Sequence, residues 1–120
     1  MAKPFVKFPD AVLHVVEFLR AVMPPGTVIR SQVPEIRPAT FIRVKRVGGQ
    51  RNSAVTERPR MDIHAWAPTE GEARDLMEDA RAHALTLRAA HEVGGPQWLP
   101  DDASGSPRYA FAFEFTLRGE

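Results

Sequence analysis

Two alternating stretches between residues 41 and 66 constrain this chain more than any other feature. In the first, Ile42 and Val44 fall on one side, whereas Arg43 and Lys45 fall on the other. In the second, two sets alternate: Pro59, Met61, Ile63 and Ala65 against Arg60, Asp62, His64 and Trp66. Because successive side chains of a strand point to opposite faces, the pattern predicts an antiparallel hairpin. One face would cover the core, and the second, basic and aromatic face would contact something else.

The residues between these stretches have the composition of a turn. Positions 47–53 read VGGQRNS, and glycine, asparagine and serine are typical turn formers. We therefore expect a loop from Gly48 to Asn52 that carries Arg51 and projects from the hairpin.

Prolines mark the ends of the elements that precede the hairpin. Apolar residues recur at helical spacing over 10–23, and Pro24, Pro25 and Gly26 stop that helix. Residues 27–33 follow as a short candidate strand. Residues 1–8 form an arm whose Phe5 and Phe8 cap the core or dock on another subunit.

The second helix has a clear start signal. Thr69 and Glu72 have capping-box spacing, and further acidic residues follow in the first turns. The apolar stripe consists of Ala73, Leu76, Met77, Ala80, Ala84 and Leu87. We expect the helix to end near residues 90–93, where Gly94, Gly95 and Pro96 prevent continuation, and a loop over 97–102 to carry Trp98.

The closing segment alternates over 109–117. Its larger side chains, Tyr109, Phe111, Phe113, Phe115 and Leu117, alternate with small or polar ones. The element order predicts a single α+β domain over residues 1–120, with a mostly antiparallel sheet of about four strands packed against two helices.

Composition limits the possible partners. The 16 Lys and Arg against 15 Asp and Glu give a net charge of +1, so no global attraction to nucleic acid or membrane is expected. The chain has no cysteine, which excludes disulfides and thiolate chemistry. No stretch approaches the roughly 18 apolar residues of a membrane span. We expect a soluble protein made in a cytoplasm, with no membrane partner.

Catalytic patterns are weak. The four histidines are dispersed, without metal-ligand spacing. Asp62 and His64 share a strand face and could form an acid/base pair or bind a metal, but a solvated or interface pair is the favoured interpretation. Asp101 and Asp102 fit a turn. We expect no enzyme activity, no metal and no cofactor.

Local charge leaves two classes of partner open. The basic residues Arg43, Lys45, Arg46, Arg51, Arg58 and Arg60 cluster on the hairpin, with Trp66 near them. A basic face with an aromatic platform is typical of nucleic-acid binding. The same face could instead pair with the acidic helix residues Asp75, Glu78 and Asp79, or with Asp101 and Asp102, on a neighbouring copy. Such different, complementary patches build head-to-tail rings.

In order and spacing, four segments together resemble the tail terminator family of long-tailed bacteriophages, in its actinobacterial phage and prophage version. They are Phe8, Pro9 and Asp10 leading into a helix that ends Met23, Pro24, Pro25, Gly26; the hairpin strand 41–49; the strand 61–66 with its Ala- and Glu-rich helix; and 94–101 leading to Pro107, Arg108, Tyr109 and a strand ending Leu117, Arg118, Gly119. One departure is that residues 87–94 are too few for a separate strand.

The resemblance implies a structural role in the virion tail, assembled in the host cytoplasm. Similar subunits form a ring, usually a hexamer, that ends tube polymerisation and joins tail to head, without cofactors. The implied partners are other copies, the tail tube protein and a head completion or connector protein, and DNA only passes through the channel. Our interface candidates are Arg43, Lys45, Gly48, Gly49, Arg51, Arg60, Asp62, His64 and Trp66. A head completion or connector subunit, or a small nucleic-acid-binding domain, are the alternatives.

Overall fold

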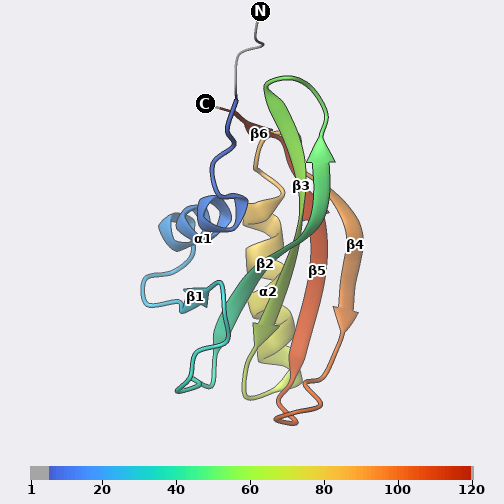
Figure 1. Cartoon of the computed structure of the whole chain (residues 1–120). Helices are drawn as coiled ribbons and strands as arrows, with labels where there is room; N and C mark the ends of the chain where they lie inside the picture. The colour runs from blue at the N-terminus through green and yellow to red at the C-terminus, as the bar shows by residue number, and fades with distance from the viewer. Residues whose placement is uncertain (1–5, 120) are drawn as a thin grey trace, which may run out of the picture.

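A computed structural model describes residues 6–119 as one sheet with two helices (Figure 1). The elements are α1 (Ala11–Val22), β1 (Ile29–Arg30), β2 (Phe41–Arg51), β3 (Thr56–Trp66), α2 (Glu70–Ala84), β4 (His91–Trp98), β5 (Arg108–Glu114) and β6 (Leu117–Arg118). The strand order is β1-β2-β3-β5-β4, and β6 pairs with β3. Among the strands of residues 6–119, only β1 and β2 pair in parallel. The α+β class, the two helices and the mostly antiparallel sheet are confirmed, but the described chain has six strands rather than about four.

Both helices begin where their capping residues predict. The Asp10 carboxylate accepts hydrogen bonds from the backbone N–H groups of Val12 and Leu13, and the Thr69 hydroxyl accepts one from Glu72. These bonds satisfy N–H groups that have no partner inside the helix. The predicted end of the second helix is wrong, because α2 stops at Ala84 and the chain turns, with Ala89 in the left-handed region at φ 51°.

The segment expected to be a helix end and a loop is the edge strand β4. It pairs with β5 from His91, opposite Glu114, to Trp98, opposite Tyr109. Register shifts on both sides of Gly94 interrupt the ladder, and an edge strand tolerates a proline such as Pro96 because only one side of its backbone must pair. Pairing with the open side of β5 therefore outweighs the local signals for a turn.

The hairpin is longer than its sequence suggested. β2 continues to Arg51 and β3 begins at Thr56, so Gly48 and Gly49 lie within a strand and not in a projecting loop. A bulge between Arg46 and Gly48 shifts the register. The short turn at 52–55 is closed by hydrogen bonds among Asn52, Ser53 and Thr56.

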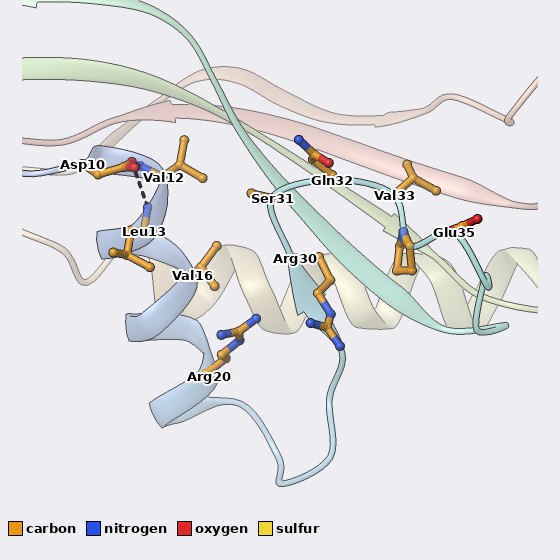
Figure 2. Close-up of a pocket in the computed structure, with 11 residues that line it drawn as sticks. Asp10, Val12, Leu13, Val16, Arg20, Arg30, Ser31, Gln32, Val33 and Glu35 are labelled. Atoms are coloured by element: carbon orange, nitrogen blue, oxygen red, sulfur yellow. Dashed lines mark hydrogen bonds between the residues drawn. The ribbon is translucent and has the colours of Figure 1, made fainter.

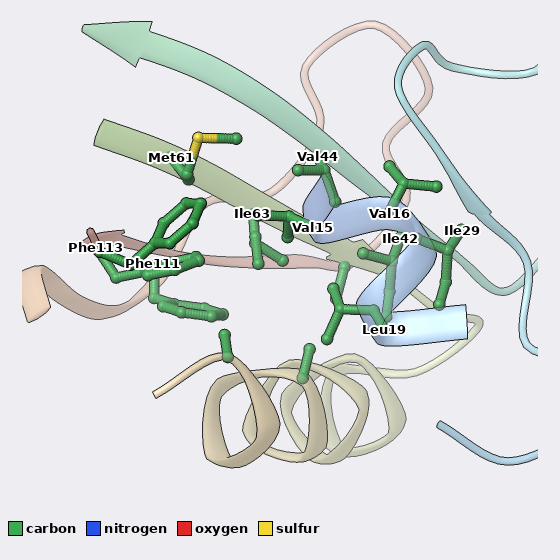
Figure 3. Close-up of a cluster of buried hydrophobic side chains, with 14 of the residues drawn as sticks. Val15, Val16, Leu19, Ile29, Ile42, Val44, Met61, Ile63, Phe111 and Phe113 are labelled. Carbon is green, nitrogen blue, oxygen red and sulfur yellow. The ribbon is translucent and has the colours of Figure 1, made fainter. Parts of the chain in front are cut away.

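The core lies on the one sheet face that both helices cover (Figure 3). Ile42, Ile63 and Phe111 project from β2, β3 and β5 toward Leu19 of α1 and Met77 of α2. The phenylalanine row of the closing segment is confirmed as core, although β5 ends at Glu114 and Phe115 lies just beyond it. Each such buried side chain contributes about 1.5–3 kcal/mol to folding.

The described part of the N-terminal arm contacts the far part of the hairpin. The Arg51 guanidinium donates to the Val6 carbonyl oxygen at 3.3 Å and lies 4.7 Å from the centre of the Phe8 ring. Phe5 lies outside the described residues. Within residues 6–119, neither helix is long and apolar enough to cross a membrane.

Candidate interaction surface

The sheet face away from the helices, here called the outer face, carries most of the predicted interface residues. Register places its side chains side by side: Arg43, His64 and Ala110 in one row, Lys45, Asp62 and Ala112 in the next, and Arg60 beside Glu114. Lys45 and Arg60 are exposed, whereas His64 is buried. Neither helix packs on this face, because the buried side chains of both helices belong to the core on the opposite one.

In the middle of the outer face, three side chains form a hydrogen-bonded chain. Nη2 of Arg43 lies 3.2 Å from Nδ1 of His64, and Nε2 of His64 lies 2.9 Å from Oδ2 of Asp62. A guanidinium only donates, so Nδ1 accepts and Nε2–H donates to the carboxylate. The bond from His64, opposed by partial burial, lowers the pKa of Asp62.

This chain leaves the imidazole without a nitrogen for proton transfer. Arg43 occupies Nδ1 and Asp62 occupies Nε2, so neither nitrogen of His64 faces a potential substrate. A general base must reach the proton that it removes. Both ring nitrogens of His64 are thus engaged within the chain, and the pair is partly buried, with the His64 side chain 10% and the Asp62 side chain 28% exposed.

Trp66 is not the exposed anchor that its alternation predicts. Its side chain is only 1% exposed, and its ring stacks on Phe41 with centroids 4.4 Å apart. The guanidinium carbons of Arg37, Arg43 and Arg108 lie 5.8, 5.8 and 5.4 Å from the centre of the ring. We call these three residues the arginine cluster. They cover the indole of Trp66, which would otherwise form an apolar patch at this end of the outer face.

Asp101 holds this end of the outer face together. Its Oδ2 accepts from the indole Nε1–H of Trp66 at 3.0 Å and from Arg37 at 3.1 Å. Burial acts to raise the pKa of Asp101, but hydrogen bonds from Trp66, Ser104, Arg37 and the Ala103 backbone outweigh it and hold the pKa far below its usual range. The turn predicted at Asp101 is confirmed, whereas its carboxylate is engaged within its own chain and not offered to a neighbouring copy.

We expect Asp101→Asn to destabilise the fold by about 1–3 kcal/mol at pH 7, because a buried charged hydrogen-bond network loses its acceptor charge. The folded pKa is depressed, so this contribution is present above the unfolded pKa of about 3.9 and is lost as pH falls below it. Urea unfolding at pH 7 and pH 3 measures the difference, which should shrink at pH 3.

The neighbouring Asp102→Asn is the matched control, since residue 102 is exposed. Its effect should stay within about 0.5 kcal/mol at pH 7. Equal effects of Asp101→Asn and Asp102→Asn on the free energy of unfolding would contradict the role given to Asp101. So would a destabilisation by Asp101→Asn that is larger at pH 3 than at pH 7.

Toward the hairpin turn, the outer face carries a second network around Glu114. Its carboxylate oxygens lie 3.4 Å from Nε of Arg60, 3.9 Å from Nε of Arg58 and 3.7 Å from Nε2 of His91. Arg58 also donates to Thr116 Oγ1 and to the Ala89 carbonyl. These ion pairs tie β3 to β5 and to the turn before β4.

The remaining candidates separate from this surface. Gly48 and Gly49 line a shallow hollow beside Arg58 and Arg60, but Arg51 turns to the N-terminal arm. The structure therefore groups Arg43, Lys45, Arg60, Asp62 and His64 on the outer face, buries Trp66 at its end, and leaves Arg51 outside it.

The sequence reasoning missed three important residues of this surface. Arg108 extends the outward row of the closing strand by one position, and reading the alternation one residue earlier would have found it. Arg37 and Glu114 come from elements whose proximity is not visible in the sequence.

Two other hollows lie outside the arginine cluster. A groove of about 530 Å³ separates α1 from residues 30–35, and Figure 2 shows Arg20 and Arg30 facing each other across it. The Arg20 guanidinium is engaged by the Ile29 carbonyl oxygen, at 2.7 Å from Nη2. A hollow of about 210 Å³ lies on the outer face, beside Asp62 and His64, with Ala110 and Ala112 among its lining residues. Within residues 6–119, no group of three or more potential metal ligands converges.

Comparison with known proteins gives this surface no family context. No family model matches the chain, and a search of curated proteins finds no significant match.

Proposed function

We propose that this chain is a ring-forming structural subunit of a phage tail, of the tail terminator type, which ends the tail tube and joins it to the head. The observation that carries the proposal is the outer face. Both helices cover the other face of the sheet, and within residues 6–119 neither helix packs over the outer face, which presents the charged side chains of Arg43, Lys45 and Arg60.

The distribution of charge supports a head-to-tail contact. The outer face carries Arg43, Lys45 and Arg60, whereas the first turns of α2, on the helix side of the sheet, carry Glu70 and Glu72. A heterologous interface needs two different complementary patches on one subunit, and such interfaces form rings when the rotation closes. The resemblance to tail terminators implies that kind of ring.

The nucleic-acid alternative is less well supported. Non-specific binding of single strands uses exposed aromatic side chains as stacking platforms. Trp66, the aromatic residue nearest the basic hairpin, is buried against Phe41 and covered by arginines. Arg46 is also engaged, in a double hydrogen bond to Glu57.

Electron microscopy of the purified protein, alone and mixed with its tail tube protein, tests the proposal. We expect closed rings or tubes capped at one end. Binding to a head connector without any effect on tube length would instead identify a head completion subunit. A protein that remains monomeric both alone and with tubes would exclude the ring.

A charge reversal tests the outer face without disturbing the core. Lys45 is exposed, so Lys45→Glu should change the free energy of unfolding by no more than about 0.5 kcal/mol. Like charges across an interface oppose association, and light scattering should show the mass falling from that of a ring toward the 13.4 kDa monomer. Arg88→Glu, a reversal at an exposed position after α2, is the control and should leave the ring intact. Rings that persist in Lys45→Glu would remove this residue from the interface.

A further inference from the structure

We propose that the arginine cluster around Trp66 is a carboxylate-binding site, and that in the ring it takes the acidic first turn of α2 from the neighbouring copy. The second half of this proposal rests on the proposed function, whereas the first half concerns the isolated subunit.

The cluster has more positive charge than the acids of residues 6–119 beside it neutralise. Arg37, Arg43 and Arg108 surround one indole ring at less than 6 Å. The acids beside them are Asp101, which binds Arg37, and Asp62, which lies beyond His64. Three guanidinium groups against two carboxylates leave one uncompensated charge. The pKa of Arg43 is lowered by burial and by the charge of Arg108, against the opposing effect of Asp62.

Each guanidinium is already oriented. Arg37 donates to Asp101, Arg43 to Nδ1 of His64, and Nε of Arg108 to the Leu99 carbonyl oxygen at 2.7 Å. A guanidinium has five N–H donors, so most donors of these three groups remain for another acceptor. Among the described residues, Nε of Arg43 is buried and has no hydrogen-bond partner. Acceptors are therefore in short supply, and a carboxylate is the group that arginine forks bind best.

The position of α2 identifies the neighbouring copy as the source of that carboxylate. Tyr109 points to the helix side of the sheet, where its hydroxyl donates to Glu70 at 3.2 Å. Arg108 precedes it in β5 and therefore points to the outer face. The acidic turn and the arginine cluster thus lie at the same level along the strands, on opposite faces. A rotation about an axis parallel to the strands brings the two patches together without a shift along that axis, as ring closure requires.

The acids of this turn are accessible. Glu70 and Glu72 are exposed, and the Asp75 side chain is 76% exposed. Glu78 is less exposed and pairs with Arg81, whereas Asp75 remains largely exposed although it pairs with Arg74. Because Glu70 lies at the level of the arginine cluster, the proposal places the acidic partner surface at Glu70, Glu72 and Asp75, nearer the start of the helix than the set of Asp75, Glu78 and Asp79 expected from the sequence.

Citrate tests the site on the isolated subunit. Thermal melting is followed at rising citrate and constant ionic strength, with chloride as the reference anion. At about ten times its Kd, a ligand specific for the folded state should raise the Tm of a domain of this size by roughly 5 °C. The rise should vanish in the double variant Arg43→Gln, Arg108→Gln and persist in the control Arg74→Gln, which changes an exposed arginine of α2.

A second experiment tests the occupant with Glu72→Arg, which changes an exposed residue in the first turn of α2 and should weaken the fold only slightly, through the loss of a favourable charge at the helix start. Analytical ultracentrifugation should show subunit association weakened roughly tenfold or more. Asp79→Arg, about two turns further along α2, should change it less than twofold.

Each failure has a distinct meaning. No citrate effect in the wild type, or the same effect in the double variant, overturns the site even if rings form. A larger Tm rise with a single-stranded DNA oligonucleotide of equal charge would make phosphate the ligand and also overturn it. Rings that tolerate Glu72→Arg overturn the choice of partner surface alone, whereas a subunit that never assembles overturns that choice together with the proposed function.

Discussion

Trp66→Ala is expected to lower the free energy of unfolding by about 3–5 kcal/mol, which is the usual cost of truncating a buried tryptophan. The variant loses the stacking on Phe41 and leaves Asp101 without its indole donor. It also removes the surface that positions Arg37, Arg43 and Arg108. Urea unfolding at pH 7, followed by circular dichroism, measures the effect.

The second tryptophan supplies the control. Trp98 on β4 is 43% exposed, so Trp98→Ala should cost clearly less, about 1 kcal/mol. Equal costs at the two positions would mean that Trp66 is not buried as described. The two variants together also test whether the indole of Trp66 is covered or exposed. From the sequence alone, we expected it to be exposed.

Gly49→Ala should strongly disrupt the pairing of β2 with β3. Gly49 has φ +98°, which costs an L-residue about 1–3 kcal/mol. A Cβ at position 49 would also lie 2.6 Å from Cα of Pro59 and 2.7 Å from the backbone N of Arg60, both on the facing strand. It would lie closer still to the carbonyl oxygen of Arg58. Because these neighbours are backbone atoms of β3, the hairpin must shift. We expect a loss of at least about 2 kcal/mol, and altered amide hydrogen exchange over β2 and β3.

Gly71→Ala is the matched control for this substitution. Gly71 lies in the first turn of α2, its φ is ordinary, and a Cβ there meets no atom within 4 Å. Alanine favours helix over glycine by about 1 kcal/mol in a helix interior, so this variant should be neutral or more stable. Destabilisation by both variants would point to a general intolerance and not to the geometry of Gly49.

Together, these variants separate two properties of the outer face. Trp66 and Asp101 stabilise the subunit itself, and their loss should lower stability even in a monomer. Lys45 and Glu72 are exposed, so their substitutions should change subunit stability by less than about 1 kcal/mol and act mainly on assembly. A defect in assembly without a defect in stability is the signature that we expect for a true contact between copies.

Local signals in the sequence predicted the elements whose physics is local. Asp10 and Thr69 cap the two helices as expected, because a cap involves residues only two or three positions apart. The alternation of Met61 and Ile63 with Asp62 and His64 correctly separated the core face from the outer face, since the period of two belongs to the strand itself.

The sequence by itself therefore determined the α+β class, the helix starts and the two-faced hairpin. Only the tertiary structure decided that residues 91–98 form a strand, that Gly48 and Gly49 extend the hairpin, and that Trp66 lies beneath arginines. The open backbone of β5 makes β4 a strand, despite glycines and a proline that favour a turn. Arg37 and Asp101 bury Trp66 from positions 29 and 35 residues away along the chain. Such contacts depend on how distant segments meet, which no local pattern encodes.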